Sequence, residues 1–187
     1  MRNQRPTCYL PSMPKTPKLR CAALTPPFHI VLVEPEIPPN TGAVARTCAA
    51  TQSPLHLVGP LGFDISERAV RRAGIDYWHL VDIHRHESFE ELLATAPQRP
   101  FHLFSAEARR SYTQASLQPG DMLVFGRESV GLPRELLAQY PERVCGIPTA
   151  GGVRSLNLSN AVAIALFEGL RRCGTLDRTY VEELTDG

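Results

Sequence analysis

Three short segments combine glycine or proline with a cluster of polar side chains, and each is expected to follow the end of a strand. They are Asn40-Thr41-Gly42-Ala43-Val44-Ala45-Arg46, Phe125-Gly126-Arg127-Glu128-Ser129-Val130-Gly131-Leu132-Pro133, and the stretch from Ile147-Pro148 to Ser159-Asn160. In open α/β sheets, ligands bind at the carboxyl ends of the strands, where such loops gather. The chemistry that these residue types offer there is the binding and orientation of a ligand by amide, carboxylate, hydroxyl and guanidinium groups.

The third segment carries more polar side chains than a helix start requires. Five of its last seven positions are polar, namely Arg154, Ser155, Asn157, Ser159 and Asn160. One Ser or Asn is enough to cap a helix, so the surplus predicts a ligand or a partner chain. The first segment is open to two interpretations. Asn40 and Arg46 are either a helix cap and a surface residue nearly two turns later, or members of a site.

The same spacings exclude several familiar sites. Gly126 and Gly131 are spaced as in a phosphate-binding loop, but Leu132 and Pro133 stand where that loop needs Lys and Ser or Thr. No G-x-G-x-x-G pattern follows the first strand, which argues against a nicotinamide dinucleotide. No Ser-His-Asp or Cys-His arrangement can be placed from spacing, so covalent catalysis has no support. The structural alternative for the second segment is a helix-starting turn with Pro133 near the first helical position.

The elements that must position these segments alternate between short apolar runs and helical stretches. Strands are expected at 28–33, 55–59, 79–82, 101–105, 122–126 and 143–148, and helices at 42–51, 66–73, 88–95, 133–139 and 158–172. This order is the βαβ rhythm of a parallel sheet. Because the strands show no clean alternation of apolar and polar residues, helices must cover both faces. The sequence therefore predicts one α/β domain over residues 28–187.

Residues 1–27 have a different composition, with six prolines, five basic residues and no acidic residue. They show no sustained hydrophobic period, so we predict a flexible tail that buries little apolar surface. The whole chain has 20 basic and 19 acidic residues and a formal net charge of +1. Residues 28–187 therefore hold 15 basic against 19 acidic residues, a net charge of about −4. If this part binds RNA, its basic residues must therefore be gathered in a local patch.

Other features of the sequence are weaker. Arg68, Arg71 and Arg72 form one face of an expected helix, for which a solvated surface is the commoner explanation and RNA phosphate the functional one. His84 and His86 alternate like strand neighbours, but two histidines without a third ligand do not predict a metal site.

The cysteine count and the hydropathy bear on location. The five cysteines are an odd number without a C-x-x-C pair, which predicts reduced thiols in a cytoplasmic protein. No run approaches the roughly 20 apolar residues of a membrane span.

Taken together, N-T-G-x-x-x-R, F-G-x-E-x-x-G-L-P, and I-P followed by R-S-L-N-L-S-N-A-V-A resemble the SPOUT superfamily of RNA methyltransferases. Within it, they are most similar to the TrmL-type 2′-O-methyltransferases of the tRNA wobble nucleotide. EPEIPPNTG and RRAGIDYW extend the resemblance, which runs from about Phe28 to Arg172. The resemblance implies a Rossmann-like parallel sheet whose C-terminal segment threads a loop to form a deep trefoil knot. Such knots are rare, and no periodicity predicts one.

The resemblance also implies the reaction and its residues. S-adenosylmethionine would be the methyl donor, with no metal, and the acceptor would be the wobble ribose of tRNA, C34 or modified U34 in leucine tRNAs. Carried over by position, cofactor binding falls to Leu103, Gly126, Ile147, Ser155 and Leu156, and catalysis and its support to Arg46, Asn40, Glu128, Ser155 and Asn157. Glycine at 126 would suit a close approach of adenosine. Because a guanidinium stays protonated, we interpret Arg46 as gripping phosphate and stabilising the developing alkoxide, not as a base.

The implied partners are a tRNA anticodon stem-loop and a second copy of the chain, with the helix from Leu158 to Leu170 as the dimer face. Arg154 joins the three arginines at 68, 71 and 72 as a candidate RNA contact. Two alternatives stay open. One is a SPOUT 2′-O-methyltransferase that modifies another position of tRNA or a ribosomal RNA, and the other is a catalytically silent RNA-binding relative. Methyl transfer distinguishes an enzyme from a silent binder.

Overall fold

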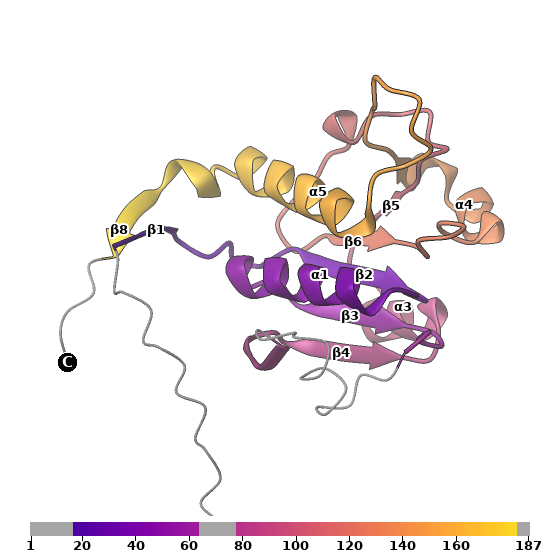
Figure 1. Ribbon diagram of the computed structural model, residues 1–187, viewed down its shortest axis with the longest axis horizontal. Helices are drawn as coiled ribbons and strands as arrows, with labels where there is room; N and C mark the ends of the chain where they lie inside the picture. Colours follow the sequence, from indigo (N-terminus) through magenta and orange to yellow (C-terminus); the bar gives the residue numbers. More distant parts are fainter. Residues whose placement is uncertain (1–16, 64–77, 183–187) are drawn as a thin grey trace, which may run out of the picture.

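The computed structural model describes residues 17–63 and 78–182, and its core is a six-stranded sheet in which every neighbouring pair is parallel (Figure 1). The strand order is β4-β3-β2-β6-β5-β7. The strands are β2 (His29–Val33), β3 (Leu55–Val58), β4 (Ile83–His86), β5 (Phe101–Phe104), β6 (Met122–Phe125) and β7 (Val144–Cys145). The predicted α/β class with a parallel sheet is confirmed.

Helices cover both faces of the sheet, as the apolar strands require. The helices are α1 (Pro38–Thr51), α3 (Phe89–Thr95), α4 (Arg134–Gln139) and α5 (Leu158–Arg172). One buried cluster joins α1 and α5 to one face, through residues such as Val44 and Leu166. A second buried cluster joins α3 and α4 to the opposite face, through Phe89 and Leu136. The sheet is therefore enclosed between two apolar layers.

Helix α1 begins four residues earlier than the predicted start at residue 42. Pro38 and Pro39 occupy its first positions, and the N-cap residue Ile37 makes no side-chain cap bond. Proline suits the start of a helix because its missing N–H would have no partner there and its φ is already helical. Asn40 consequently lies inside the first turn and is not the cap. Its side chain is therefore available for other contacts.

Two other predicted elements have different bounds. The strand expected at 79–82 is a 3-10 helix at Trp78–Leu80 followed by β4, because it is Ile83 that pairs with Leu55 of β3. The strand expected at 143–148 shrinks to the two residues of β7. Beyond it, the backbone of Gly146 bonds to the segment that follows β5, donating to the carbonyl of Arg110 and accepting from the N–H of Tyr112. The helix expected at 66–73 lies outside the described residues.

The predicted tail contains a strand. Lys18–Cys21 form β1, which pairs antiparallel with β8 (Thr179–Glu182), and Leu24 packs against the core. The pairing brings together residues 162 positions apart, as in the bond from Arg20 to Glu182, so no local pattern signals it. The proposed boundary at residue 27 stays a prediction, because residues 1–16 are not described.

The trefoil knot implied by the resemblance also stays a prediction. The structure shows that the chain leaving β7 passes in close contact with the segment that follows β5. A Cβ atom on Gly146 would lie 2.6 Å from the carbonyl oxygen of Ser105. From there the chain returns to the opposite side of the sheet and forms α5 beside α1 (Figure 1).

Candidate active site

Glu128, in the loop after β6, joins that loop to the start of α1. Its carboxylate accepts hydrogen bonds from the backbone N–H groups of Glu36 (2.9 Å) and Ile37 (3.3 Å) and from Nδ2 of Asn40 (3.0 Å). Oδ1 of Asn40 in turn accepts a bond of 2.9 Å from Nδ2 of Asn157, 117 positions away. The structure thus brings three of the predicted site residues into one chain of hydrogen bonds.

Asn157 holds the other end of this chain. It is the N-cap of α5, and its Oδ1 accepts bonds from the backbone N–H groups of Ser159 (2.9 Å) and Asn160 (3.4 Å) and from Oγ of Ser159 (2.7 Å). The oxygen of the amide serves the helix and its nitrogen serves Asn40. The orientation of the amide is therefore fixed from both sides.

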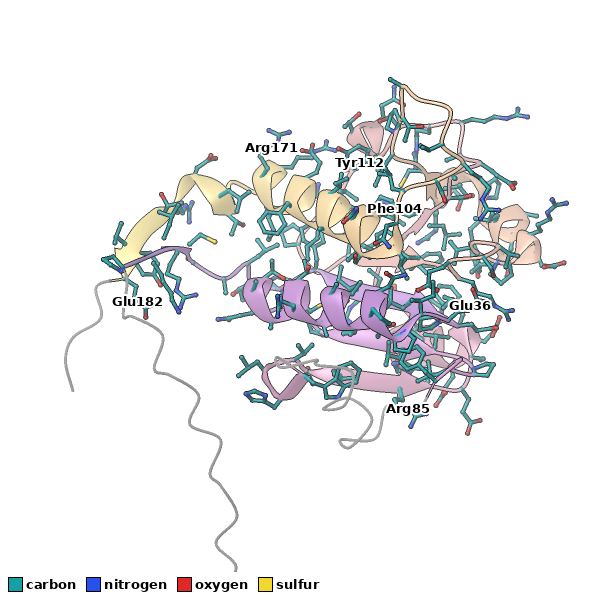
Figure 2. All side chains as sticks on the ribbon, in the orientation of Figure 1. Glu36, Arg85, Phe104, Tyr112, Arg171 and Glu182 are labelled. Atoms are coloured by element: carbon teal, nitrogen blue, oxygen red, sulfur yellow. The ribbon has the colours of Figure 1, made fainter. Side chains whose placement is uncertain are left out.

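Two acidic residues that we did not single out complete the junction between the loops. Oε2 of Glu36 accepts a bond of 3.1 Å from the backbone N–H of Ser129, while the N–H of Glu36 donates to Glu128. Glu34 forms an ion pair with Arg127. Figure 2 shows Glu36 at the end of the molecule where α1 begins. The signal was available in the sequence, because these carboxylates directly follow β2 and belong to EPEIPPNTG.

Gly126 is required by its own loop. Arg127 and Gly131 exchange backbone hydrogen bonds of 3.1 and 2.9 Å, which fold the loop back on itself. A Cβ atom at position 126 would lie 2.2 Å from the backbone of Gly131 and of Leu132. Loop closure therefore accounts for this glycine without any ligand, in contrast to the reason that we first gave for it.

The positions assigned to the cofactor lie at neighbouring strand ends. Leu103 is fully buried in β5 and pairs with Val144 of β7, Ile147 packs against the core, and Leu156 is half-buried. Within the described ranges, residues 147–156 make neither a backbone hydrogen bond nor a side-chain hydrogen bond. This stretch therefore presents a row of amide and carbonyl groups that a ligand can pair.

The remaining site residues are exposed. Arg46 lies on α1 six positions after Asn40, and Ser155 and Arg154 lie in the segment before α5. The other three arginines predicted to contact RNA, at positions 68, 71 and 72, fall outside the described residues. The structure thus brings Asn40, Glu128 and Asn157 together, whereas among the described residues Ser155 makes no hydrogen bond to any of them.

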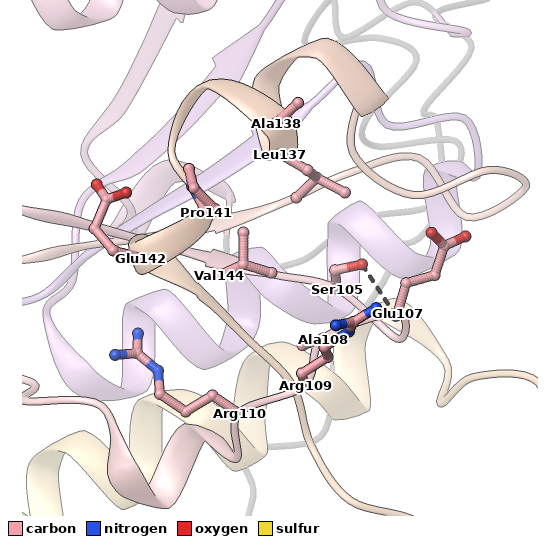
Figure 3. A pocket seen from close by; sticks show the side chains of 10 residues that line it. All are labelled: Ser105, Glu107, Ala108, Arg109, Arg110, Leu137, Ala138, Pro141, Glu142 and Val144. Carbon is pink, nitrogen blue, oxygen red and sulfur yellow. Dashed lines mark hydrogen bonds between the residues drawn. The ribbon is translucent and has the colours of Figure 1, made fainter.

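A pocket of about 440 Å³ opens beside these loops, between the segment after β5 and the end of α4 (Figure 3). Ser105, Arg109, Arg110, Leu137 and Val144 are among its lining residues. None of the positions assigned to the cofactor lines it, although Val144 is the strand partner of Leu103. We place the site at the hydrogen-bonded loops, because three of the predicted site residues are joined there and none of the predicted site residues lines this pocket.

Four histidines gather on the face of the sheet that α3 covers, away from these loops. His29 Nδ1 lies 2.9 Å from Nε2 of His56, whose Nδ1 lies 3.0 Å from Nε2 of His86, and His84 stacks on His56. Arg99 donates to Nδ1 of His29 at 3.0 Å, so that nitrogen is an acceptor. It follows that His56 donates from Nε2 to His29 and accepts from His86.

Burial keeps His29 and His56 neutral. It lowers the pKa of His29 to about 4 and of His56 to about 3, and the nearby Arg99 and the other histidines act in the same direction. Over the described parts of the chain, no group of three His, Cys, Asp or Glu side chains is arranged to hold a metal ion. No helix of the described residues is both long and apolar enough to cross a membrane.

Comparison with known proteins gives consistent relatives. The model of the SpoU rRNA Methylase family matches residues 27–167. The tRNA (cytidine(34)-2′-O)-methyltransferase of Burkholderia ambifaria is 42% identical over 150 residues, which is 79% of this chain and 96% of that protein. Its counterpart in Burkholderia pseudomallei is 43% identical over 150 residues, with the same coverage of both chains.

Solved structures agree with these relatives. A structure described as giving insights into 2-OH methylation of C/U34 on tRNA is 46% identical, with a TM-score of 0.73 over 78% of this chain and 95% of that one. The AdoMet-bound rRNA methyltransferase from Sinorhizobium meliloti is 28% identical, with a TM-score of 0.68 over 78% of this chain and 56% of that one. The family match covers the sheet, all three loops and most of α5. The chain therefore belongs to the SpoU rRNA methylase family, whose members transfer methyl groups from S-adenosylmethionine.

Proposed function

We propose that this protein methylates the ribose 2′-oxygen of nucleotide 34, cytidine or uridine, in tRNA, with leucine tRNAs as the expected substrates. The observation that carries the proposal is the hydrogen-bonded chain Asn157–Asn40–Glu128. It joins the three loops at the carboxyl ends of the strands, and the two Burkholderia relatives that match over about 150 residues are tRNA (cytidine(34)-2′-O)-methyltransferases.

The residues present fit S-adenosylmethionine as the methyl donor. We assign its binding to the loops that contain Leu103, Gly126, Ile147, Ser155 and Leu156. Among the described residues, the backbone of 147–156 makes no hydrogen bond, and this supports the assignment, because adenosine and the amino acid end of the donor need hydrogen-bond donors and acceptors that a folded chain usually satisfies internally. When bound, the donor supplies an electrophilic methyl group on a sulfonium.

The residues of this chain then have to orient the ribose and stabilise its oxygen as the new C–O bond forms and the C–S bond breaks. We assign Arg46 to the substrate phosphate and to the developing charge on the 2′-oxygen, and the departing proton to phosphate or solvent. Asn40, Glu128 and Asn157 act as positioning residues, since they fix α1, the loop after β6 and the start of α5 relative to one another. Ser155 is exposed in the same segment and is assigned to the donor or to the ribose.

A homodimer in the cytoplasm completes the proposal. The inner face of α5, including Val162 and Leu166, is buried within the same chain and does not provide the dimer contact. The outer face carries Ile164 and Phe167, which remain 37% and 44% exposed. We assign the dimer contact to this outer face, because an exposed apolar stripe on a helix favours association with a second apolar surface.

The test is methyl transfer from labelled S-adenosylmethionine to unmodified tRNA, followed by nuclease mapping, with wild type, Arg46→Ala and Arg46→Lys in parallel. Label at the 2′-oxygen of nucleotide 34 that is lost in Arg46→Ala supports the proposal. Nearly full turnover by Arg46→Lys would exclude bidentate positioning by the guanidinium. Label elsewhere in tRNA or rRNA would move the substrate, and donor binding without transfer to any RNA would indicate a silent binder.

A further inference from the structure

The two-stranded ribbon formed by β1 and β8 stands apart from the sheet, at the end of the molecule opposite the candidate active site. Figure 1 shows it beyond the C-terminal end of α5, and Figure 2 shows Glu182 there and Glu36 at the other end. The 15 residues of α5 span about 22 Å at 1.5 Å per residue. The family match begins at residue 27, so β1 precedes the part of the chain shared with the family model.

The two faces of this ribbon differ in chemistry. Opposite residues of an antiparallel pair point to the same side. Lys18 faces Glu182 and Arg20 faces Tyr180, so one face carries two cations, one carboxylate and an aromatic ring. Leu19 and Val181 face each other on the other side. Tyr180 is 56% exposed, which leaves its ring accessible for stacking.

The two cations of this face belong to a part of the sequence that is basic throughout. The preceding residues contribute Arg2, Arg5 and Lys15, and residues 1–27 contain no acidic residue. Residues 28–187 carry a net charge of about −4, which repels a polyanion. A protein of this charge that binds tRNA needs a local cationic surface. Lys18 and Arg20 are the basic residues of this acid-free part that the structure describes, and pairing with β8 fixes them beyond the C-terminal end of α5.

We propose that the Lys18, Arg20 and Tyr180 face of the ribbon is a second RNA contact, which binds tRNA at a distance from the nucleotide being methylated. Lys18 and Arg20 contact phosphate groups, and Tyr180 stacks on an exposed base or rests against a ribose. The ion pair with Glu182 uses Nε of Arg20 at 2.8 Å. A guanidinium has five N–H donors, so this bond leaves others for phosphate. The assignment rests on the proposed function, because it takes tRNA as the ligand.

The experiment measures binding of the full-length protein to unmodified tRNA over a series of salt concentrations, separately from methyl transfer. Each phosphate contact that is lost lowers the slope of log affinity against log salt by about 0.7 to 0.9. We expect Lys18→Ser with Arg20→Ser to reduce the slope by roughly 1.5. Glu182→Gln should bind more tightly than wild type, because it removes the carboxylate that competes for Arg20. A purely structural ribbon would give no gain.

Further variants test the aromatic ring and the face. Tyr180→Leu should weaken binding about fivefold or more, whereas Tyr180→Phe, which keeps the ring, should bind as wild type does. Leu19→Ser, on the opposite face, is the matched control and should leave RNA affinity unchanged. Unchanged slopes in the double Lys18 and Arg20 variant would overturn the inference. The inference would also be overturned if these substitutions changed the sedimentation of the protein but not its RNA affinity. The ribbon would then be a contact with a second copy of the chain.

The outcome is independent of the proposed reaction. If no tRNA is methylated but the salt slope depends on Lys18 and Arg20, the proposed function fails and the RNA contact stands. If nucleotide 34 is methylated and the slope does not respond, the ribbon inference alone fails. A short anticodon stem-loop provides a further check, because it should lose less affinity than whole tRNA in the double variant.

Discussion

Removal of the Glu128 carboxylate tests whether the three loops depend on one another. The carboxylate accepts three hydrogen bonds, from Glu36, Ile37 and Asn40. A bond to a charged group contributes about 1.5 to 3 kcal/mol when it is buried, and less where water can replace it. Because this site is partly exposed, we assign about 1 kcal/mol to each bond. Glu128→Ala should then lower the free energy of unfolding by about 3 kcal/mol.

Glu128→Gln gives an intermediate case that follows from the geometry. If its oxygen takes the place of Oε1, the bonds from Ile37 and Asn40 survive and the N–H of Glu36 faces an amide NH₂ group. If its oxygen takes the place of Oε2, only the bond from Glu36 survives. The first orientation keeps two of the three bonds and the second keeps one, so the free energy of unfolding should fall by about 1 to 2 kcal/mol. Methyl transfer should fall about 100-fold in the Ala variant, as expected for a displacement of about 1 Å at the site.

The assays are urea unfolding followed by circular dichroism, and single-turnover methyl transfer at saturating tRNA and methyl donor. Glu135→Gln, an exposed carboxylate in α4, is the control and should change stability by less than about 0.5 kcal/mol. The order wild type, Gln variant, Ala variant is expected in both assays. A Glu128→Ala protein with wild-type stability and turnover would refute the conclusion that this carboxylate positions the loops.

Three further predictions follow from single contacts. Gly126→Ala should lower the free energy of unfolding by about 3 kcal/mol, because its Cβ would overlap the loop backbone. Gly151→Ala is the control, since a Cβ atom there would meet no atom within 4 Å, and it should have almost no effect in the same urea titration. Asn157→Asp keeps the oxygen that caps α5 but loses the N–H that donates to Asn40. The free energy of unfolding should change by less than about 1 kcal/mol, while methyl transfer should fall at least about tenfold. Wild-type activity in this variant would contradict the positioning role of Asn157. His29 and His56 have lowered pKa values in the folded protein, so the unfolded chain binds more protons below pH 6.5, and stability should fall as pH drops from 6.5 to 5. His56→Gln should make that decline shallower, and a flat profile in the wild type would contradict burial of the neutral pair.

Sequence patterns predicted the sheet well because its strands are short, apolar and buried on both faces. β2 and β6 were placed within one residue at each end, and α5 was placed with both ends correct, since Asn157 marks its start and Gly174 follows its end. Where the prediction failed, either contacts between residues distant in sequence or an unexpected helix start determined the structure. β7 stops at Cys145 because the segment after β5 takes the hydrogen bonds of Gly146.

The start of α1 shows why the site was only partly predictable. We expected Asn40 to be either a helix cap or a site residue, and two prolines already supply a start that needs no capping side chain. That leaves Asn40 free to bond Glu128 and Asn157. The motif listed the right residues, but the bonds between them depend on loops that meet only when the strands are aligned in the sheet. Glu34 and Glu36 were missed although they stand in EPEIPPNTG, because nothing local indicates that they contact the loop after β6.

Gly126 shows that a residue assigned to a cofactor can be required by its own loop. We assigned it to the cofactor from the resemblance, and the structure shows that its own loop excludes a side chain, with 2.2 Å between a Cβ atom and the backbone. Loss of activity in Gly126→Ala would therefore not demonstrate contact with the methyl donor. The comparison that does so is donor binding by variants at Ile147 and Leu156, whose side chains are half-buried. If these variants keep their stability and lose donor affinity, the donor lies along the backbone of residues 147–156. If they bind the donor normally, the pocket that Ser105 lines becomes the better location.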